Sequence, residues 1–149
     1  MKARKTLPPT YLLISIAAII ALHFLFPVLI IIPSLWNLLG IIPLALGVFL
    51  NLSADNAFHR ANTTVRPFEE SSALITRGVF RISRNPMYLG MVLILPGVAV
   101  LVGSLTPYVV VLAFAILMDR KFIKVEERML AEKFGAEWEG YTHSTRRWL

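Results

Sequence analysis

The sequence predicts an all-α integral membrane protein: a bundle of four transmembrane helices, in which helices 3 and 4 form a helical hairpin with a cytoplasmic helix extension. Of the 149 residues, 56% are hydrophobic and 16% are charged, whereas a soluble domain has roughly 25% charged residues. The mean hydropathy is +0.67. A chain of this length leaves room for one compact bundle, so we expect residues 1–149 to form a single membrane domain.

The first apolar run covers residues 11–32 and includes only Ser15 and His23 as polar side chains. At about 1.5 Å per residue it is long enough to cross a hydrocarbon core of about 30 Å. The basic residues Lys2, Arg4 and Lys5 before it resemble the start of a signal peptide. The run is too long for one, however, and no small-residue cleavage pattern follows. We therefore expect an uncleaved anchor helix.

The second run follows a turn at Pro33-Ser34 and predicts a helix over residues 35–55, with Trp36 at the membrane interface. Asn51, Asp55 and His59 continue one face of it, which indicates a helix end that protrudes into water. Asp55 and His59 are spaced to act together, although an ordinary solvated helix end explains them equally well.

Residues 87–118 are almost unbroken in their apolarity and too long for one helix in a bilayer. The turn-forming residues Gly103-Ser104-Leu105-Thr106-Pro107 divide this stretch. We predict a tight hairpin of helices over 86–103 and 107–134, the second of which continues past the membrane to a stop at Gly135. The cytoplasmic loop 56–85 and the cytoplasmic tail 135–149 complete the chain.

The positive charges predict the topology. All of them lie before the first helix, between the second and third, or after the apolar part of the fourth: Lys2, Arg4, Lys5; Arg60, Arg66, Arg77, Arg81, Arg84; Arg120, Lys121, Lys124, Arg128, Lys133, Arg146 and Arg147. The positive-inside rule therefore puts both termini and the long loop in the cytoplasm. The net charge of +6 is explained by this orientation and by attraction to anionic membrane lipid, and not by nucleic-acid binding.

Two polar features lie on this cytoplasmic side, and the first is the start of the third helix. Asn85 and Pro86 are typical of an N-cap and a first helical residue, with Asn85 accepting from the first turn. The helix would present free N–H groups toward the cytoplasm, with Arg81 and Arg84 beside them, where a carboxylate or phosphate binds well. An ordinary capped helix with interfacial Tyr88 and snorkelling arginines is the alternative.

The second feature is Glu126. On a helical wheel it points along the centre of an apolar face, and Glu127 lies near the edge of that face. Asp119 and Lys133 lie seven residues to either side. The face consists of Phe122, Ile123, Val125, Met129, Leu130 and Phe134. A carboxylate there needs a partner. Glu126 either forms a structural ion pair with an arginine such as Arg77 or Arg84, or lines a polar site.

The sequence does not favour cysteine chemistry or a metal site. Cysteine is absent, which excludes disulfides, thiolate metal sites and thiol nucleophiles. His23, His59 and His143 have no metal-ligand spacing, so we expect no metal site. His23 is expected to be a neutral side chain packed between helices.

Three pieces of sequence occur in a familiar order: Leu74-x-x-x-Gly78-Val79-Phe80, then Arg84-Asn85-Pro86-x-Tyr88-x-Gly90, then Glu126-Glu127-x-x-Leu130-x-x-x-Phe134-Gly135-x-x-Trp138-x-x-Tyr141. With a membrane hairpin between the last two, this set resembles the C-terminal half of the isoprenylcysteine carboxyl methyltransferase-like family of integral membrane methyltransferases, which is related to the phospholipid N-methyltransferases. The resemblance covers about residues 64–141.

The resemblance implies an S-adenosyl-L-methionine-dependent methyltransferase whose last helices enclose the cofactor at their cytoplasmic ends, while a lipophilic acceptor arrives from the bilayer. It implies catalytic roles for Arg84 and Glu126 and a cofactor pocket made by Arg84, Asn85, Pro86, Tyr88, Glu126 and Glu127. The family commonly has His where this chain has Asn85. An amide cannot titrate there, but it can cap the helix and hydrogen-bond a bound group. The acceptor and the oligomeric state stay open.

The chemistry of the residues agrees with that cofactor. Arg84 at a helix N-terminus suits its carboxylate, Glu126 or Glu127 its ammonium or ribose hydroxyls, and Tyr88 or Trp138 its sulfonium or adenine. Methyl transfer to a carboxylate needs no general base at neutral pH, whereas transfer to a protonated amine does. Because the sequence shows no obvious base, it favours a carboxylate acceptor.

Two alternative functions remain. Membrane sterol or enone reductases that use NADPH share the Arg-x-Pro-x-Tyr-x-Gly segment and the acidic pair, although four helices leave little room for a sterol cavity. A small non-enzymatic four-helix transporter would need polar residues at the bilayer midplane, whereas polarity here gathers at one side.

Overall fold

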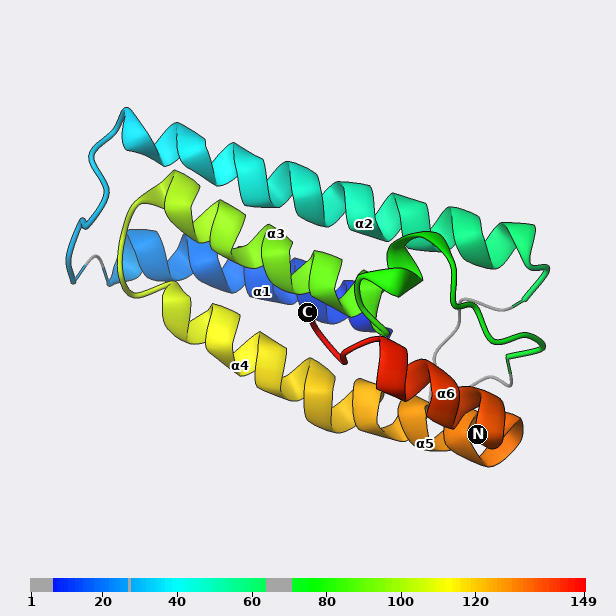
Figure 1. The fold of residues 1–149 in the computed structure, drawn as a ribbon. Helices are drawn as coiled ribbons and strands as arrows, with labels where there is room; N and C mark the ends of the chain where they lie inside the picture. Colours follow the sequence, from blue (N-terminus) through cyan, green and yellow to red (C-terminus); the bar gives the residue numbers. More distant parts are fainter. Residues whose placement is uncertain (1–6, 27, 64–70) are drawn as a thin grey trace.

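The computed structural model describes residues 7–26, 28–63 and 71–149, and these form an all-helical bundle (Figure 1). The α-helices are α1 (Pro8–Leu25), α2 (Ile41–Arg60), α3 (Pro86–Val102), α4 (Tyr108–Met118), α5 (Lys124–Phe134) and α6 (Ala136–Ser144). The 3₁₀ turns η1 (Trp36–Gly40) and η2 (Gly78–Arg81) precede α2 and α3. A π-helical turn, η3 (Asp119–Ile123), joins α4 to α5. The expected fold class is therefore confirmed at the level of an all-α bundle.

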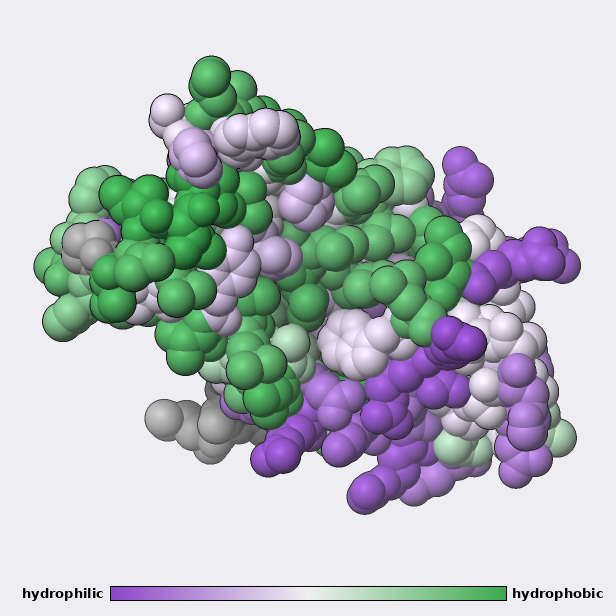
Figure 2. Space-filling view, turned by 60° about the vertical axis from the view of Figure 1, so that its left-hand side comes forward, coloured by the Kyte–Doolittle hydropathy of each residue, from purple (hydrophilic) through white to green (hydrophobic). Residues whose placement is uncertain are grey.

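Two helical stretches within the described residues are long and apolar enough to cross a membrane, Pro8–Leu25 and Trp36–Arg60, and Pro86–Val102 is a shorter apolar helix. Large apolar side chains such as Phe24, Leu46 and Phe49 are exposed on these stretches. Figure 2 shows this apolar surface next to a hydrophilic side. Contact with lipid explains such a surface. The number of four membrane crossings stays a prediction. The orientation in the membrane also stays a prediction, and four of the basic residues on which it was based, Lys2, Arg4, Lys5 and Arg66, lie outside the described residues.

The helix boundaries differ from the expected ones mainly in the first half. Helix α1 ends at Leu25, because Phe26 precedes a proline and leaves the helical region at φ −139° and ψ 64°. Helix α2 continues to Arg60, five residues beyond the expected end. The tail is not a simple extension either, since residues 136–144 form α6.

The second half follows the expected hairpin. Helix α3 ends at Gly103, which adopts the left-handed region at φ +78° that favours glycine. The helix that begins at Tyr108 continues through η3 and α5 to Phe134, and Gly135 ends it with φ +47°. The extension and its stop therefore lie where the sequence indicated.

The continuous segment of η1 and α2 approaches α3 closely at two pairs of glycines. A methyl group at Gly47 would overlap the carbonyl oxygen of Gly90, and one at Gly97 would lie 2.8 Å from the carbonyl oxygen of Gly40. Asn51 adds a side-chain hydrogen bond of 2.9 Å to the carbonyl oxygen of Gly47. Small residues at such contacts let helix backbones pack directly in a membrane protein.

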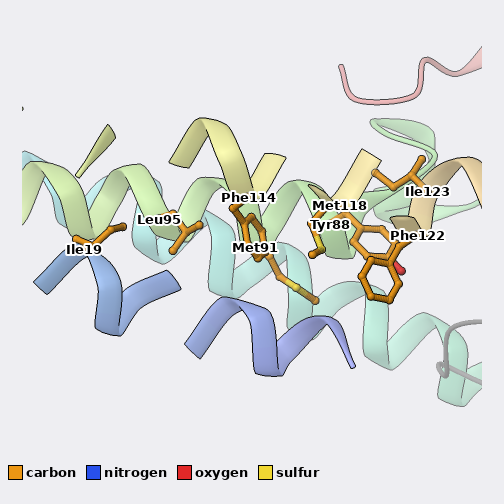
Figure 3. Close-up of a cluster of buried hydrophobic side chains, with 8 residues drawn as sticks. All are labelled: Ile19, Tyr88, Met91, Leu95, Phe114, Met118, Phe122 and Ile123. Atoms are coloured by element: carbon orange, nitrogen blue, oxygen red, sulfur yellow. The ribbon is translucent and has the colours of Figure 1, made fainter. Parts of the chain in front are cut away.

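Two buried clusters hold the N-terminal end of α3. The larger joins α1, α3, α4 and η3, and Figure 3 shows its members, Ile19, Tyr88, Met91, Leu95, Phe114, Met118, Phe122 and Ile123. The smaller contains Ala54, Phe80, Trp138 and Tyr141. The hydroxyl of Tyr141 donates a 2.6 Å hydrogen bond to the carbonyl oxygen of Phe80. The start of α3 is thus fixed from both sides.

Candidate active site

A cavity of about 580 Å³ lies at the N-terminal end of α3. Its volume is in the range of about 300–1,000 Å³ that small-molecule sites occupy. Its polar lining includes Arg84, Asn85, Tyr88, Glu126, Glu132 and Lys133, and its apolar lining includes Leu7, Phe58, Leu74, Met87, Met91, Met129 and Trp138. The same end of the bundle carries η2, α5 and α6 (Figure 1). One cavity thus combines a charged region with a larger apolar region.

Glu126 lies in this cavity and accepts a 2.7 Å hydrogen bond from the hydroxyl of Tyr88. Burial raises the pKa of Glu126 to about 7, and the hydrogen bond from Tyr88 opposes that rise. Neither arginine expected as its partner pairs with it in the part of the chain that the structure describes, because Arg84 pairs with Glu127 instead. The partner of Glu126 is therefore a neutral phenol, and no cation pairs with this carboxylate among residues 7–26, 28–63 and 71–149.

Glu127 has the opposite surroundings. It is 9% exposed, and it lies behind the cavity wall and not among the lining residues. Its Oε1 accepts a 3.1 Å hydrogen bond from Asn85 Nδ2 and lies 3.3 Å from Arg84 Nε. Its Oε2 accepts two hydrogen bonds from Arg147, of 2.9 Å from Nε and 2.7 Å from Nη2. Protein donors thus occupy both oxygens.

The helical wheel placed Glu126 at the centre of the buried face and Glu127 at its edge, but Glu127 is the more buried of the two side chains. Val125, which was expected to be buried, is 40% exposed. The helical wheel treated residues 122–134 as one regular α-helix. The π turn places Phe122 and Ile123 on a different angular spacing from α5. The predicted apolar face therefore combined residues of η3 and α5, whose angular positions do not follow one regular helical wheel.

Asn85 occupies the N-cap position with Pro86 as the first helical residue, but its side chain makes no capping hydrogen bond. It donates instead to Glu127 and, at 3.2 Å, to the carbonyl oxygen of Arg147. The expectation that it accepts from the first turn is wrong, because a buried carboxylate is the stronger partner for its NH₂ group. The free N–H groups at the start of α3 are not covered by this side chain.

Arg84 presents a cation at the cavity wall. Its side chain is 13% exposed, and its guanidinium lies over the Trp138 ring, 5.7 Å from the centroid. The buried Nε lies near Glu127 but makes no hydrogen bond to the residues that the structure describes. An aromatic face and a carboxylate thus fix the position of the cation while it stays in contact with the cavity.

The sequence analysis missed Arg147 and the C-terminal segment around it. The Arg84 N–H donates to the carbonyl oxygen of Arg146 at 3.0 Å, and the Ser83 hydroxyl donates to that of Arg147 at 3.0 Å. Arg147 Nη1 also reaches Asp119 Oδ1 at 3.4 Å, and Lys124 pairs with the other oxygen of Asp119. Only charge marked Arg147 in the sequence, because it follows the last patterned segment.

Asp55, His59 and His23 lie away from the cavity, whereas Lys133 lines it. Asp55 and His59 form an ion pair of 3.4 Å at the exposed end of α2. His23 lies 2.9 Å from the Ser104 hydroxyl, near the α3–α4 turn at the other end of the bundle. Lys133 lines the cavity together with Glu132, a carboxylate that the sequence analysis did not single out.

Comparison with known proteins adds two findings. The sequence model of a family described as phospholipid methyltransferase matches residues 35–137. The fold is similar to a solved structure of the eukaryotic intramembrane Ras methyltransferase, isoprenylcysteine carboxyl methyltransferase, with 22% identity and a TM-score of 0.69. That match covers 95% of this chain and 51% of the other, so the chain spans about half its length. No curated protein matches.

Proposed function

Because this chain belongs to the phospholipid methyltransferase family, we propose that it transfers a methyl group from S-adenosyl-L-methionine to a lipophilic acceptor at the cytoplasmic membrane face. The family match and the shared fold confirm the resemblance seen in the sequence motifs. The chain is an integral membrane protein of a methyltransferase family, and the comparisons give no support to a reductase or a transporter. The cofactor, the acceptor, the four crossings and the cytoplasmic termini are our proposals.

The observation that carries the proposal is a cavity whose polar end combines the Arg84 cation, the Glu126 carboxylate bound to Tyr88, and the aromatic faces of Tyr88 and Trp138. These residues fit the charges of S-adenosyl-L-methionine. Arg84 would hold its carboxylate and Glu126 its ammonium, while Tyr88 or Trp138 would face its adenine or sulfonium. When bound, the cofactor supplies a methyl group activated by a sulfonium. Asn85 and Pro86 would complete the pocket wall beside the helix N-terminus.

The acceptor would use the apolar part of the cavity. Phe58, Met87, Met91 and Met129 line it, and they match a hydrocarbon chain better than a polar substrate. Methyl transfer is an in-line displacement, so the main contribution of these walls would be to hold the acceptor in a near-attack geometry. We propose a carboxylate acceptor such as that of a prenylated cysteine, for which no base is needed.

One observation favours an amine acceptor as a second candidate. Burial raises the pKa of Glu126 to about 7. A carboxylate with this pKa is matched to removing a proton from an ammonium group near neutral pH. In this alternative Glu126 takes the proton of a phospholipid headgroup amine before the amine is methylated, in place of holding the cofactor's ammonium.

The cofactor site is tested by calorimetric titration of the purified protein with S-adenosyl-L-methionine. We expect binding, and a loss of affinity in Arg84→Ala and Glu126→Gln that exceeds any loss of folding seen in thermal unfolding. Arg81→Ala and Glu137→Gln are matched controls, because both side chains are exposed. Unchanged affinity in both site variants would contradict the site, and binding of NADPH without S-adenosyl-L-methionine would contradict the function.

The acceptor is tested by incubation with a cofactor that carries a labelled methyl group, together with total membrane lipid or with a prenylated cysteine analogue. Label that base hydrolysis releases is a methyl ester and supports the carboxylate acceptor. Base-stable label in phospholipid supports the amine. A protein that binds the cofactor but labels neither preparation would contradict a lipophilic acceptor of either class.

A further inference from the structure

We infer that Arg147 is a positioning residue for the cofactor pocket, acting through Glu127 on Arg84. This inference rests on the proposed function. After α6 the chain returns to the start of α3, where Arg147 donates two hydrogen bonds to one oxygen of Glu127, at 2.9 and 2.7 Å. The other oxygen is left to Asn85 and Arg84. Glu127 therefore links the C-terminal segment to the two polar residues at the cavity wall.

The charges around Glu127 explain why it matters that Arg147 binds one of its oxygens and that Asn85 and Arg84 share the other. Arg84 and Arg147 flank one buried carboxylate, and Asp119, which Arg147 also reaches, is shared with Lys124. Because Arg147 donates from Nε and Nη2 to one oxygen of Glu127, Arg84 meets the carboxylate at a single nitrogen, Nε. Within the part of the chain that the structure describes, Arg84 thus keeps charge and donors available at the cavity, where an anionic ligand group would use them.

Loss of the Arg147 side chain would change this balance. One oxygen of a carboxylate that is 9% exposed would lose its partner, and Arg84 is the nearest remaining cation. A buried charge without a partner is costly, so Arg84 would move to a two-point pair with Glu127 and away from the cavity. The backbone contacts would remain, since Ser83 and Asn85 bind the carbonyl oxygen of Arg147 and not its side chain. The segment therefore stays attached in a side-chain variant.

The first test compares Arg147→Met with Arg146→Met. Both lose one positive charge from the same segment, but the Arg146 side chain is exposed. We expect the Kd for S-adenosyl-L-methionine to rise about tenfold in Arg147→Met and less than about twofold in Arg146→Met. Equal affinity of Arg147→Met and the wild type would overturn the inference.

A double variant distinguishes positioning from a merely structural clamp. Glu127→Gln added to Arg147→Met removes the charge that captures Arg84, so cofactor affinity should recover toward the wild type. A clamp that only supports the fold predicts no recovery, because the double variant has lost more bonds. An affinity of the double variant equal to or weaker than that of Arg147→Met would contradict positioning.

A measurement without ligand keeps this inference separate from the proposed function. Thermal unfolding of Arg84→Met, of Arg147→Met and of a variant that carries both of these substitutions reports whether the two arginines are coupled through Glu127. We expect a melting shift in the double variant that differs from the sum of the single shifts. Additive shifts would overturn the inference, whether or not the wild type binds the cofactor, whereas a wild type that binds none contradicts the proposed function alone.

Discussion

Glu126 and Glu127 are adjacent in the sequence but differ in every property that decides a role. One lies in the cavity with a phenol as its partner, and the other lies behind the wall with two arginines and an amide. A residue whose oxygens are already occupied supports its neighbours, and one with remaining acceptor capacity is able to meet a ligand. The environment, and not the residue type, separates the two.

Glu126 predicts how stability depends on pH. Its folded-state pKa of about 7 lies above the ordinary 4.5, so the folded protein binds more protons between these values. The free energy of unfolding therefore falls as pH rises from about 4.5 to about 7, by roughly 1–3 kcal/mol, and is flat above that range with respect to this group. Thermal unfolding in detergent between pH 5 and pH 8 measures this loss.

Glu126→Gln should remove this pH dependence, so the variant matches the wild type near pH 5 and melts a few degrees higher above pH 7. Tyr88→Phe should extend the loss to higher pH, because the Tyr88 hydrogen bond lowers the pKa of Glu126. A wild type and a Glu126→Gln variant with parallel pH profiles would contradict the raised pKa.

The sequence predicted which residues share the cavity better than it predicted their partners, and their role in binding stays a prediction. Arg84, Asn85, Tyr88 and Glu126 meet at one cavity as expected, because a helix N-terminus and a helix extension return to the same level of the bundle. The hydrogen bond from Asn85 to Glu127 could not be predicted. Whether the Asn85 side chain caps α3 or binds a carboxylate depends on where α5 lies relative to the start of α3. Arg147 belongs to no periodic pattern, and only the folded chain brings it to Glu127.

At the scale of elements, η3 has the largest effect on the site. A π turn adds one residue to a helical turn, which rotates everything that follows by about 100° relative to an uninterrupted α-helix. No residue pattern in Asp119–Ile123 marks such a turn. The sequence therefore predicted the length of this helix correctly and the direction of its glutamates less well.

Deletion of Arg120 removes the extra residue that the π turn accommodates, so it should convert η3 to a regular α-helix while Glu126 keeps its direction toward the cavity. We expect unchanged helix content by circular dichroism and retained S-adenosyl-L-methionine binding in calorimetry. The exposed Arg120 side chain makes Arg120→Ala a suitable control, with the residue count kept and binding unchanged. Loss of binding in the deletion variant, with binding kept in Arg120→Ala, would contradict the interpretation of η3 as one accommodated extra residue.

The glycine contacts between α2 and α3 predict a loss of stability. Gly47→Ala should lower the free energy of unfolding by about 1–3 kcal/mol, because a methyl group there overlaps the backbone of α3. Gly140→Ala is the control, since nothing lies within 4 Å of its added methyl group and alanine favours a helix. Denaturant titration in detergent should rank Gly47→Ala below the wild type and Gly140→Ala at or above it.

At the scale of the whole molecule, composition and charge predicted the membrane bundle, because hydrocarbon demands long apolar helices whatever their contacts. Which helices pack against each other could not be predicted from composition and charge. The acceptor is the least predictable property, since the apolar cavity wall is assembled from residues of α1, α2, α3 and α5 that share no motif.

The absence of cysteine makes the proposed topology directly testable. Leu105→Cys places a thiol in the exposed turn between α3 and α4, and His143→Cys places one on the exposed surface of α6. A membrane-impermeant maleimide added to intact cells should label Leu105→Cys, and should label His143→Cys only after the membrane is opened. The reverse pattern would invert the orientation, and equal labelling would contradict an α3–α4 hairpin that crosses the membrane.

The two glycine pairs also determine which part of the bundle is able to move. Gly40 and Gly47 are seven residues apart, as are Gly90 and Gly97, so each set returns to one helix face after about two turns. Because backbone atoms meet at two levels, the two helices cannot slide past each other by a change of side-chain rotamers alone. Helices α2 and α3 therefore act as a stationary frame. Widening of the cavity for a lipid chain would then come from its other walls, which are the start of α1, the segment 71–75 and helices α5 and α6.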